Sequence, residues 1–365
     1  MRPRPEVESL KACPHGGIDY GELESLGISP EAIIDFSVSS NPFGPPPGVW
    51  DGLKGVALDR YPDSAATELR RCLSARLGVP PESILAGSGS MELIRLVALA
   101  YFGPGDRVLI VEPTFGEYEV ASHLAGCQVI RQRTEAGDGF RLRLKDALGL
   151  IRRHRPKGVF VCNPNSPTGQ YLGRGEVEEI LAACPEGLLI LDEAFIAFVE
   201  DAWNSLDMIE GGNLLLLRSM TKDYALAGLR MGYAIAHPQT ISALRRVCPP
   251  WNTSAVAQRA AMAALRDEKF LAQSLARLRE ARDFLVVELT RLGLPPLPSR
   301  VNFFLVEVDD AARFRLALLK KGILVRDCTS FGLPRHVRIA VRPLPQAQRL
   351  IQALGEVTAD GRSRG

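Results

Sequence analysis

A lysine in a run of small polar residues is the strongest chemical signal in this sequence. Lys222 ends the run Ser219-Met-Thr-Lys222, and Arg230 follows it a few residues later. A lysine amine can form a Schiff base with an aldehyde. A hydroxyl and an arginine together can hold a phosphate, because they supply neutral and charged donors. The pattern therefore predicts a site for an aldehyde that carries a phosphate, although the short motif alone also fits a surface lysine before a helix.

A carboxylate at the end of an apolar run supports this reading. Asp192 follows Leu188-Leu-Ile-Leu191. A buried carboxylate is costly without a partner, and a protonated pyridine nitrogen is a suitable one. Together with Lys222, Asp192 predicts the cofactor pyridoxal 5'-phosphate (PLP), whose ring is an electron sink while its nitrogen stays charged. The alternative for Asp192 is an ordinary helix N-cap.

A turn of small residues precedes an expected helix and suits a phosphate. Ser88, Gly89 and Ser90 would present free N–H groups and the positive end of the helix dipole. The nucleotide-binding pattern GxGxxG is absent, because its third glycine would fall at Glu92. This favours a lone phosphate ester over a dinucleotide, and it counts against an oxidoreductase.

Further residues could line the same site. Phe115 could lie flat on a planar cofactor, or it could belong to the core. The Pro- and Gly-rich turn Asn163–Gly169 follows an expected strand, where site-lining loops occur. Arg326, Arg338 and Arg342 cluster in the C-terminal part. Strand alternation would place Arg338 and Arg342 on one face, where they could bind anions rather than lie solvated at the surface.

Composition excludes several classes of protein. The chain has 365 residues, 46% hydrophobic and 24% charged, and 44 basic residues balance 42 acidic ones to a net charge of +2. This predicts no nucleic-acid or membrane partner. The N-terminus lacks the apolar stretch of a signal peptide. Seven scattered cysteines and five scattered histidines indicate reduced thiols, a cytoplasmic protein and no metal site.

The order of apolar segments predicts an α/β fold. Residues 1–45 read as an N-terminal arm, irregular with a short helical piece, that packs on the smaller domain and the active site. Residues 46–250 read as a large PLP-binding domain, 251–357 as a smaller α/β domain and 358–365 as a flexible tail. Strands that alternate with helices predict a mostly parallel sheet covered on both faces. Ligands of such sheets bind at the carboxyl ends of the strands. The expected helices of the large domain cover 66–77, 91–101, 116–125, 143–153 and 174–184, and its expected strands cover 107–112, 128–133, 158–162, 188–192, 213–217 and 232–236.

These residues together resemble the fold type I PLP enzymes, from about residue 15 to about residue 354. Within them, the chain is similar to histidinol-phosphate aminotransferases and to threonine-phosphate decarboxylases of cobalamin biosynthesis. Three features favour the decarboxylases. The first is the opening His15-Gly-Gly17 with Asp35-Phe-Ser37, and the second is Arg326-Asp-Cys328 followed by Arg338. The third is Phe195, because the aminotransferases usually carry there a tyrosine that bonds the cofactor's 3-oxygen.

The resemblance implies roles around the cofactor. Lys222 would be the Schiff-base lysine, Asp192 would pair with the pyridine nitrogen, and Phe115 would stack on the ring. The cofactor phosphate would be held by Ser88, Gly89, Ser90, Ser219 and Arg230, with help from Tyr61 of the partner subunit. The resemblance thus implies a homodimer with a shared active site.

It also implies how a phosphorylated amino acid would bind. His15, Gly16 and Arg326 would take its phosphate, and Arg338 its carboxylate. Two positions depart from the family pattern. Ser166 stands where an asparagine usually contacts both cofactor and substrate, with Asn165 as the alternative contact, and Ser39 replaces an asparagine of the arm.

The sequence thus predicts decarboxylation of L-threonine O-3-phosphate to (R)-1-aminopropan-2-yl phosphate, or of L-serine phosphate to ethanolamine phosphate. The Cα–carboxylate bond would stand perpendicular to the cofactor ring. An aminotransferase that acts on histidinol phosphate is the alternative, and it would align the Cα–H bond instead. A PLP-fold protein that only binds a ligand is the alternative of another class.

Overall fold

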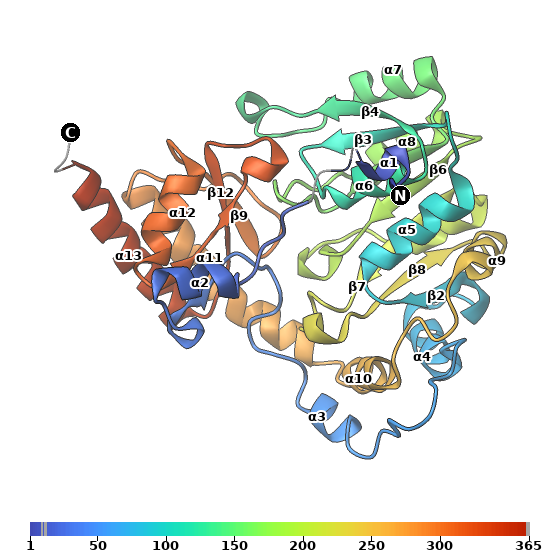
Figure 1. Cartoon of the computed structure of the whole chain (residues 1–365), viewed down its shortest axis with the longest axis horizontal. Helices are drawn as coiled ribbons and strands as arrows, with labels where there is room; N and C mark the ends of the chain where they lie inside the picture. Colours follow the sequence, from blue (N-terminus) through green and yellow to red (C-terminus); the bar gives the residue numbers. More distant parts are fainter. Residues whose placement is uncertain (9, 11–12, 363–365) are drawn as a thin grey trace.

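The structure is a computed structural model that describes residues 1–8, 10 and 13–362, with 358–362 described by their backbone. It has a large α/β part, a smaller α/β part and an N-terminal arm that crosses from one to the other (Figure 1). The boundaries of the domains predicted from the sequence stay a prediction. None of the helices in the described part of the chain is long and apolar enough to cross a membrane.

A seven-stranded sheet forms the centre of the large part. Its strands lie in the order β2-β8-β7-β6-β5-β3-β4. Neighbouring strands run parallel except where β8 pairs antiparallel with β2 and with β7. The predicted α/β fold with a mostly parallel sheet is thus confirmed, although the sequence reading missed β2. The strands are β2 Ile84–Gly87, β3 Arg107–Glu112, β4 Gln128–Arg133, β5 Gly158–Cys162, β6 Leu188–Asp192, β7 Leu214–Ser219 and β8 Gly232–Ala236.

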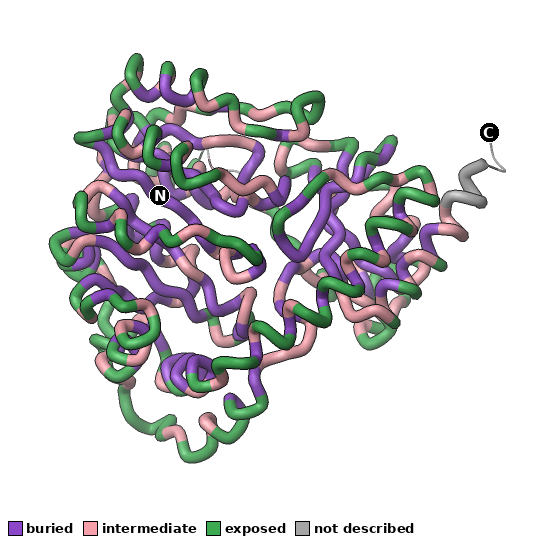
Figure 2. Tube along the Cα trace, turned by 180° about the vertical axis from the view of Figure 1, so that it is seen from behind, coloured by how far each residue is buried: buried purple, intermediate pink, exposed green. Residues whose placement is uncertain are grey.

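Helices cover both faces of this sheet. The alternation of side chains along β6 shows it, because Leu189 and Leu191 pack in one core cluster while Leu188 and Ile190 pack in another. The inner strands β5, β6 and β8 are therefore buried along their whole length, and the buried course of the sheet is visible in Figure 2. The helices of this part are α3 Gly48–Gly52, α4 Thr67–Leu77, α5 Ser90–Tyr101, α6 Glu117–Leu124, α7 Leu144–His154, α8 Arg174–Ala183, α9 Pro238–Val247 and α10 Ala255–Arg266.

The smaller part is built on a three-stranded antiparallel sheet in the order β11-β12-β9. Residues 323–327 form two short strands, β10 and β11, that belong to different sheets. Its elements are α11 Phe270–Arg291, β9 Phe303–Glu307, α12 Ala311–Leu319, β10 Ile323–Leu324, β11 Arg326–Asp327, β12 His336–Ala340 and α13 Leu344–Arg362.

Two details of the C-terminal part differ from the sequence reading. Strand β12 ends at Ala340, so Arg342 does not share its face with Arg338. The Nε of Arg342 instead donates to Gln346 Oε1 at 3.0 Å. Helix α13 also continues to Arg362, into the segment expected to be a tail, because each further residue of a started helix adds one hydrogen bond.

The arm joins the smaller part through backbone pairing. It contains α1 Pro5–Glu8, α2 Tyr20–Leu26 and β1 Ile34–Asp35. Strand β1 pairs parallel with β10, and Phe36 continues the pairing because its N–H donates to Leu324 O at 2.7 Å. Leu23 of α2 packs beside Leu324. Residues 20–36 of the arm thus form an extra layer of the smaller part.

Candidate functional site

Lys222 and Asp192 meet at one edge of the large sheet. Asp192 is the last residue of β6, and Lys222 follows the end of the neighbouring strand β7. Burial lowers the pKa of the Lys222 amine to about 8, and the positive charges of Arg338 and Arg230 add to this effect. A larger fraction of the amine is therefore neutral near pH 7 than for a solvated lysine, and the neutral amine is the nucleophile.

Asp192 is buried and its two oxygens have separate partners. The hydroxyl of Tyr118 donates to Oδ2 at 2.7 Å, and the N–H of Ala194 donates to Oδ1 at 3.0 Å. Burial raises the pKa of Asp192 to about 6, while both hydrogen bonds lower it. A cation at this carboxylate would therefore stabilise its ionised form.

Tyr118 was missed by the sequence analysis. It lies one helical turn after Phe115, so the spacing of these two aromatic residues could have indicated a shared face. Its ring stacks on Phe160 at 4.8 Å between centroids, with 9° between the ring planes. The strand and the helix together thus fix the hydroxyl that supports Asp192.

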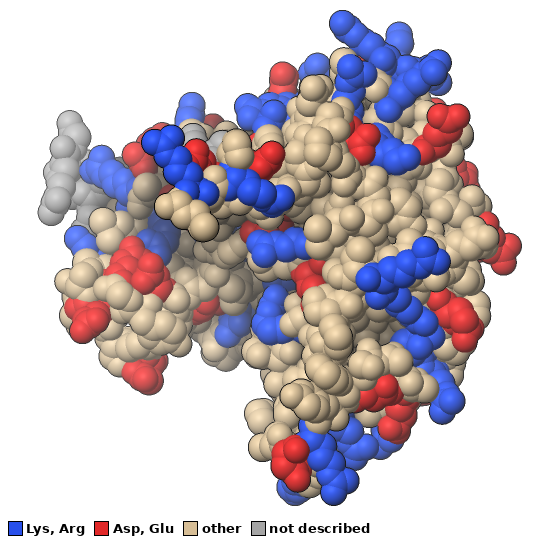
Figure 3. All heavy atoms as spheres, turned by 45° about the vertical axis from the view of Figure 1, so that its right-hand side comes forward, with Lys and Arg blue, Asp and Glu red and all other residues tan. Residues whose placement is uncertain are grey.

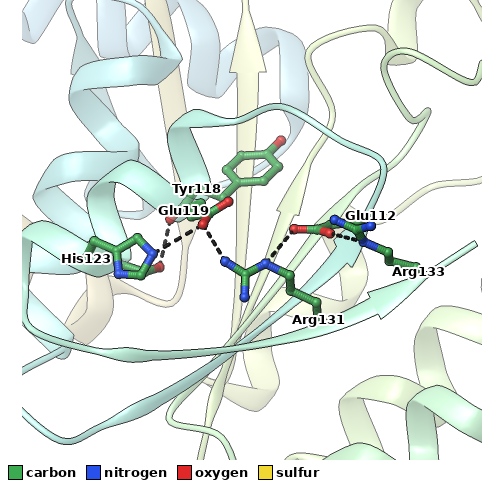
Figure 4. A network of polar contacts seen from close by, with 7 residues as sticks. Glu112, Tyr118, Glu119, His123, Arg131 and Arg133 are labelled. Atoms are coloured by element: carbon green, nitrogen blue, oxygen red, sulfur yellow. Dashed lines mark hydrogen bonds and ion pairs between the residues drawn. The ribbon is translucent and has the colours of Figure 1, made fainter. Parts of the chain in front are cut away.

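A chain of charged side chains holds the helix of Tyr118 to the sheet (Figure 4). Glu112, at the end of β3, lies 3.2 Å from the Nε of Arg131 on β4. Arg131 also pairs with Glu119 of α6, which lies 3.2 Å from His123 one turn later. Each pair is partly exposed and is worth at most about 1 kcal/mol, but together they join β3, β4 and α6.

The turn before α5 lies against Arg230. Gly89 has φ +79°, and a Cβ built on it would lie 2.9 Å from Arg230 Nη2, so a side chain is excluded there. Paired ends of β2, β8 and β7 bring Ser219 to the same edge. One expected donor is already used, because the Ser88 N–H donates to Glu92 Oε2 at 2.6 Å. Gly89, Ser90 and Ser219 leave a cradle of small residues beside the Arg230 guanidinium.

These groups fit PLP. A lysine amine with a lowered pKa, a carboxylate that would be stabilised by a cation and a glycine-lined turn beside an arginine occur at one sheet edge. They match its aldehyde, its pyridine nitrogen and its phosphate, respectively.

Two phenylalanines lie close to this edge in different surroundings. Phe115 is half-buried, with its ring 5.8 Å from the His15 ring and 5.7 Å edge-on from Tyr118. Phe195 is buried and packs edge-on against Phe303 at 5.0 Å. The Lys222 Nζ lies 5.7 Å from the Phe195 ring. Phe195 therefore belongs to the core of the smaller part, and its packing carries no information about the reaction.

The two polar residues of the turn after β5 have different partners. The Asn165 side chain makes its hydrogen bonds to neighbouring loop residues, since its Nδ2 donates to Pro113 O at 2.9 Å and its Oδ1 accepts from Thr114 at 2.9 Å. Ser166 Oγ instead accepts from Arg338 Nη1 at 2.7 Å. The structure thus places Ser166, and not Asn165, beside the arginine predicted to bind substrate.

Arg338 and Arg326 are neighbours on paired strands, directly opposite each other in the register of β12 and β11. Arg338 is buried, which lowers its pKa to about 10. Its Nη2 donates to Ser37 O at 2.8 Å, while its Nε has no partner among the described residues. Arg326 Nη2 donates to Pro14 O at 2.6 Å. Two adjacent guanidinium groups with spare donors form a site for an anion.

A cavity of about 380 Å³ opens beside Arg326, between the arm and α12. His15 and Gly16 line it from the arm. A Cβ on Gly16 would lie 2.7 Å from Ser37 O, so this position requires a glycine. The structure therefore brings together the residues predicted to take a substrate phosphate.

The contacts of two predicted site residues do not indicate a role in the site. Ser39 is buried, and its Oγ has no partner among the described residues, while its carbonyl accepts from Asn302 at 3.1 Å. Tyr61 is 78% exposed and stacks on Trp251 at 4.2 Å. Its predicted contact with the cofactor of a second subunit stays a prediction.

Asn41 was not predicted as a site residue. Its backbone N–H donates to Lys222 O at 2.7 Å, and its side chain donates to Asp223 O at 3.0 Å. The end of the arm therefore holds the backbone of the lysine. No sequence pattern indicates this, because the contact joins segments that are far apart in the chain.

A mostly parallel sheet with a buried lysine and aspartate at its carboxyl edge defines a fold type I PLP enzyme. The sequence pattern of the family described as aminotransferase class I and II matches residues 31–354. The chain belongs to this family, and its cofactor is PLP.

Relatives with named activities are similar over most of their length. The histidinol-phosphate aminotransferase of Moorella thermoacetica is 37% identical, over 92% of this chain and 87% of that protein. Histidinol-phosphate aminotransferase 2 of Pseudomonas aeruginosa is 35% identical, over 98% of this chain and 97% of that protein.

Solved structures agree on the fold. The histidinol-phosphate aminotransferase of Sinorhizobium meliloti, in complex with pyridoxal-5'-phosphate, has a TM-score of 0.87, 25% identity and 98% coverage of both chains. The L-threonine-O-3-phosphate decarboxylase of Porphyromonas gingivalis has a TM-score of 0.80, 27% identity and coverage of 89% of this chain and 99% of that one.

These comparisons correct the predicted reaction. The prediction of a phosphate-ester decarboxylase of cobalamin biosynthesis is wrong, because the relatives that match 92% and 98% of the chain at 37% and 35% identity are named histidinol-phosphate aminotransferases. The physical reason is that both reactions use the same lysine, aspartate and arginines. They differ in which substrate bond is aligned, and the three features that favoured the decarboxylase do not report on that alignment.

Proposed function

We propose that this chain is an aminotransferase that acts on histidinol phosphate or a closely related phosphorylated amine, with a 2-oxo acid as the amino-group acceptor. The similarity to histidinol-phosphate aminotransferases across nearly the whole chain carries the proposal. The buried pair Lys222 and Asp192 supplies the cofactor chemistry. The adjacent Arg326 and Arg338 supply an anion site for a phosphate or a carboxylate.

Lys222 would move a proton in this reaction. PLP, when bound, draws electron density from the carbon that carries the substrate amine. Once the substrate has displaced it, the Lys222 amine is free to accept the proton of that carbon. It can then return the proton to the carbon on the other side of the nitrogen. The pKa of about 8 suits this task, because a group that both takes and gives a proton works best with a pKa near the operating pH.

Asp192 would hold the cofactor and the arginines would hold the substrate, and none of them would take part in the proton transfer. Tyr118 and the Ala194 N–H hold the Asp192 carboxylate, so it can keep the cofactor nitrogen charged. Arg338 is fixed by Ser166 and Ser37 and leaves a donor for a substrate anion. A substrate clamped in this way needs little further ordering before the proton moves.

A homodimer would complete the site. Tyr61 and Trp251 form an exposed aromatic pair on the large part, with Trp50 and Leu58 also exposed. Exposed aromatic residues of this kind are typical of subunit interfaces. A partner subunit seated there would receive Tyr61, as the family resemblance implies. A cytoplasmic location stays a prediction from the sequence.

The test is a direct assay of the purified protein with PLP. Histidinol phosphate and 2-oxoglutarate should give glutamate, and threonine phosphate under the same conditions should release no carbon dioxide. The Lys222→Ala variant is the control for reactions that do not need the site. Carbon dioxide from threonine phosphate without glutamate from histidinol phosphate would overturn the proposal.

A further inference from the structure

Three side chains that metal ions favour meet where the arm passes α6. Cys13 and His15 come from the arm, and Glu117 comes from the first turn of the helix. Their ligand atoms all lie within 4.8 Å of one another. A thiolate, an imidazole and a carboxylate are the ligand types that Zn²⁺ takes in proteins. The sequence predicted no metal site because Glu117 is far from Cys13 and His15 in the chain, and the fold brings the three together.

The surroundings leave room for the thiol. A Cβ on Gly116 would lie 2.5 Å from Cys13 Sγ, so only a glycine lets the thiol approach the start of α6. The His15 side chain is 44% exposed and the Glu117 side chain 6% exposed. An ion could therefore enter from the imidazole side and find the carboxylate already positioned.

The two oxygens of Glu117 face different groups. Oε2 lies 3.3 Å from Arg95 Nη2, while Oε1 lies 3.3 Å from His15 Nε2. Arg95 thus holds one oxygen as an outer partner, in the way that ligating carboxylates are commonly held, and the other oxygen is turned to the imidazole. The positive charges of Arg95 and Arg326 near the triad oppose a cation, so two anionic ligands are needed to balance them.

The distances suit a small tetrahedral ion. Zinc bonds of about 2.0–2.3 Å place ligand atoms roughly 3.3–3.5 Å apart. His15 and Glu117 already have this separation, and Cys13 lies close enough to complete it with a small movement of the arm. Three protein ligands leave a fourth position for water or an anion.

We propose that Cys13, His15 and Glu117 form a zinc site that fastens the arm to α6 at the mouth of the substrate cavity. Pro14, between the two arm ligands, is already held by Arg326, and the His15 ring lies 5.8 Å from Phe115. A bound ion would therefore hold the arm over the cavity and remove His15 from its contacts with substrate. The zinc site does not depend on which reaction the enzyme catalyses.

The binding step is a simple exchange. A sulfur–zinc bond forms, and the proton of the Cys13 thiol passes to solvent. Burial and the charge of Glu117 raise the pKa of this thiol, so zinc must compete with its proton. No oxidant or other reactant is needed.

The experiment adds zinc chloride to the PLP-loaded enzyme and measures binding by competition with a coloured chelator. We expect one ion per chain. Cys13→Ser should weaken binding by at least about tenfold, since even the loss of an outer partner costs roughly 10–100-fold in affinity. Cys72→Ser is the matched control, because Cys72 lies on α4 and is also a partly exposed free thiol. Its zinc affinity should equal that of the wild type.

A second variant and a second readout guard against misfolding. Glu117→Gln keeps the shape of the side chain but removes its charge, and it should also weaken binding. Zinc should slow amide hydrogen exchange at residues 13 and 15–17 in the wild type and in Cys72→Ser, but not in Cys13→Ser. The proposal is overturned if the wild type binds zinc no more tightly than about 10 μM. It is equally overturned if both triad variants bind like the wild type, or if exchange in the arm does not change.

Discussion

The cofactor half and the substrate half of the site are built in different ways. Asp192 ends β6, and Lys222 and the phosphate turn follow β7 and β2, so all three lie at the carboxyl ends of strands in one sheet. Arg326, Arg338 and His15 are brought together from the smaller part and the arm. The first half is set by one rigid scaffold, and the second depends on how separate segments pack. Short sequence motifs can therefore predict the cofactor chemistry, but they cannot predict which substrate is bound.

The largest effect is expected in the cofactor half. Lys222→Ala should abolish the visible absorption of the Schiff base and lower turnover by at least about 10³-fold, because both the covalent link and the mobile proton are lost. Absorption spectra and steady-state rates measure this. Lys54→Ala is the control, since Lys54 is exposed and pairs only locally with Asp51. The same absorption spectrum in the wild type and in Lys222→Ala would contradict the assignment of Lys222 as the Schiff-base lysine.

In the substrate half, Arg338→Gln should lower kcat/KM by roughly tenfold to a hundredfold. A charged hydrogen bond contributes about 1.5–3 kcal/mol, and the spectrum of the cofactor should not change. Arg342→Gln should have little effect, because Arg342 lies past β12 and donates to Gln346. Equal losses in the two variants would contradict the placement of the anion site.

Tyr118→Phe should weaken PLP binding by about tenfold while the substrate KM stays nearly constant. The change removes a hydrogen bond of 2.7 Å to Asp192, and such a bond to a charged group is worth about 1.5 kcal/mol or more. Because that bond lowers the pKa of Asp192, its loss should raise this pKa further above its ordinary value. Titration of the cofactor-free protein with PLP tests the affinity, and an unchanged Kd would show that the hydroxyl is dispensable.

The two halves are also linked by charge. PLP reconstitution of the cofactor-free protein requires the neutral Lys222 amine, so its rate should rise with pH and level off above about pH 8. Arg338 is one of the charges that lower this pKa. Arg338→Gln should therefore move the rise to higher pH, whereas Arg338→Lys keeps the charge and should leave it in place. Stopped-flow measurements of the reconstitution rate between pH 6 and pH 10 test this. A pH profile that Arg338→Gln leaves unchanged would mean that the charge of Arg338 does not affect Lys222.

The smallest effect is expected at Ser39. Its buried hydroxyl lacks a partner among the described residues, so Ser39→Ala should change the free energy of unfolding by less than about 1 kcal/mol. Ser122→Ala is the comparison, because Ser122 is buried as well but its hydroxyl donates to Tyr118 O at 2.7 Å. Denaturation curves should show the larger loss for Ser122→Ala, and the reverse order would mean that Ser39 has a partner.

The same division explains what could be predicted from the sequence. The apolar runs expected as strands at 188–192 and 213–217 located two neighbouring strands, and the fold then had to place Lys222 beside Asp192. Arg326 and Arg338 were found as well, but their opposition in the register of β11 and β12 was not. The reaction was predicted wrongly because the three features that favoured the decarboxylase, Phe195 among them, do not report on which substrate bond is aligned.

Contacts between distant segments account for the rest. Tyr118, Glu117 and Asn41 each act through a partner far away in the chain, and nothing in their local sequence indicates it. Asn165 and Ser166 are adjacent and equally polar, yet only the three-dimensional contacts separate them. Residue type and spacing thus predict which functional side chains lie at the ends of strands. The contacts between segments that are far apart in the chain are known only from the structure.

The pairing of β1 with β10 has a consequence for exchanging parts between relatives. Backbone bonds join the segment 34–36 to residues 322–324 and to Ala340, so the arm and the smaller part share one hydrogen-bonded unit. A chimeric enzyme that takes only the C-terminal portion of a relative would pair foreign strands with the native arm. A transplant of substrate preference must therefore carry two pieces of the gene, one from each end, even though they encode a single unit of the folded protein.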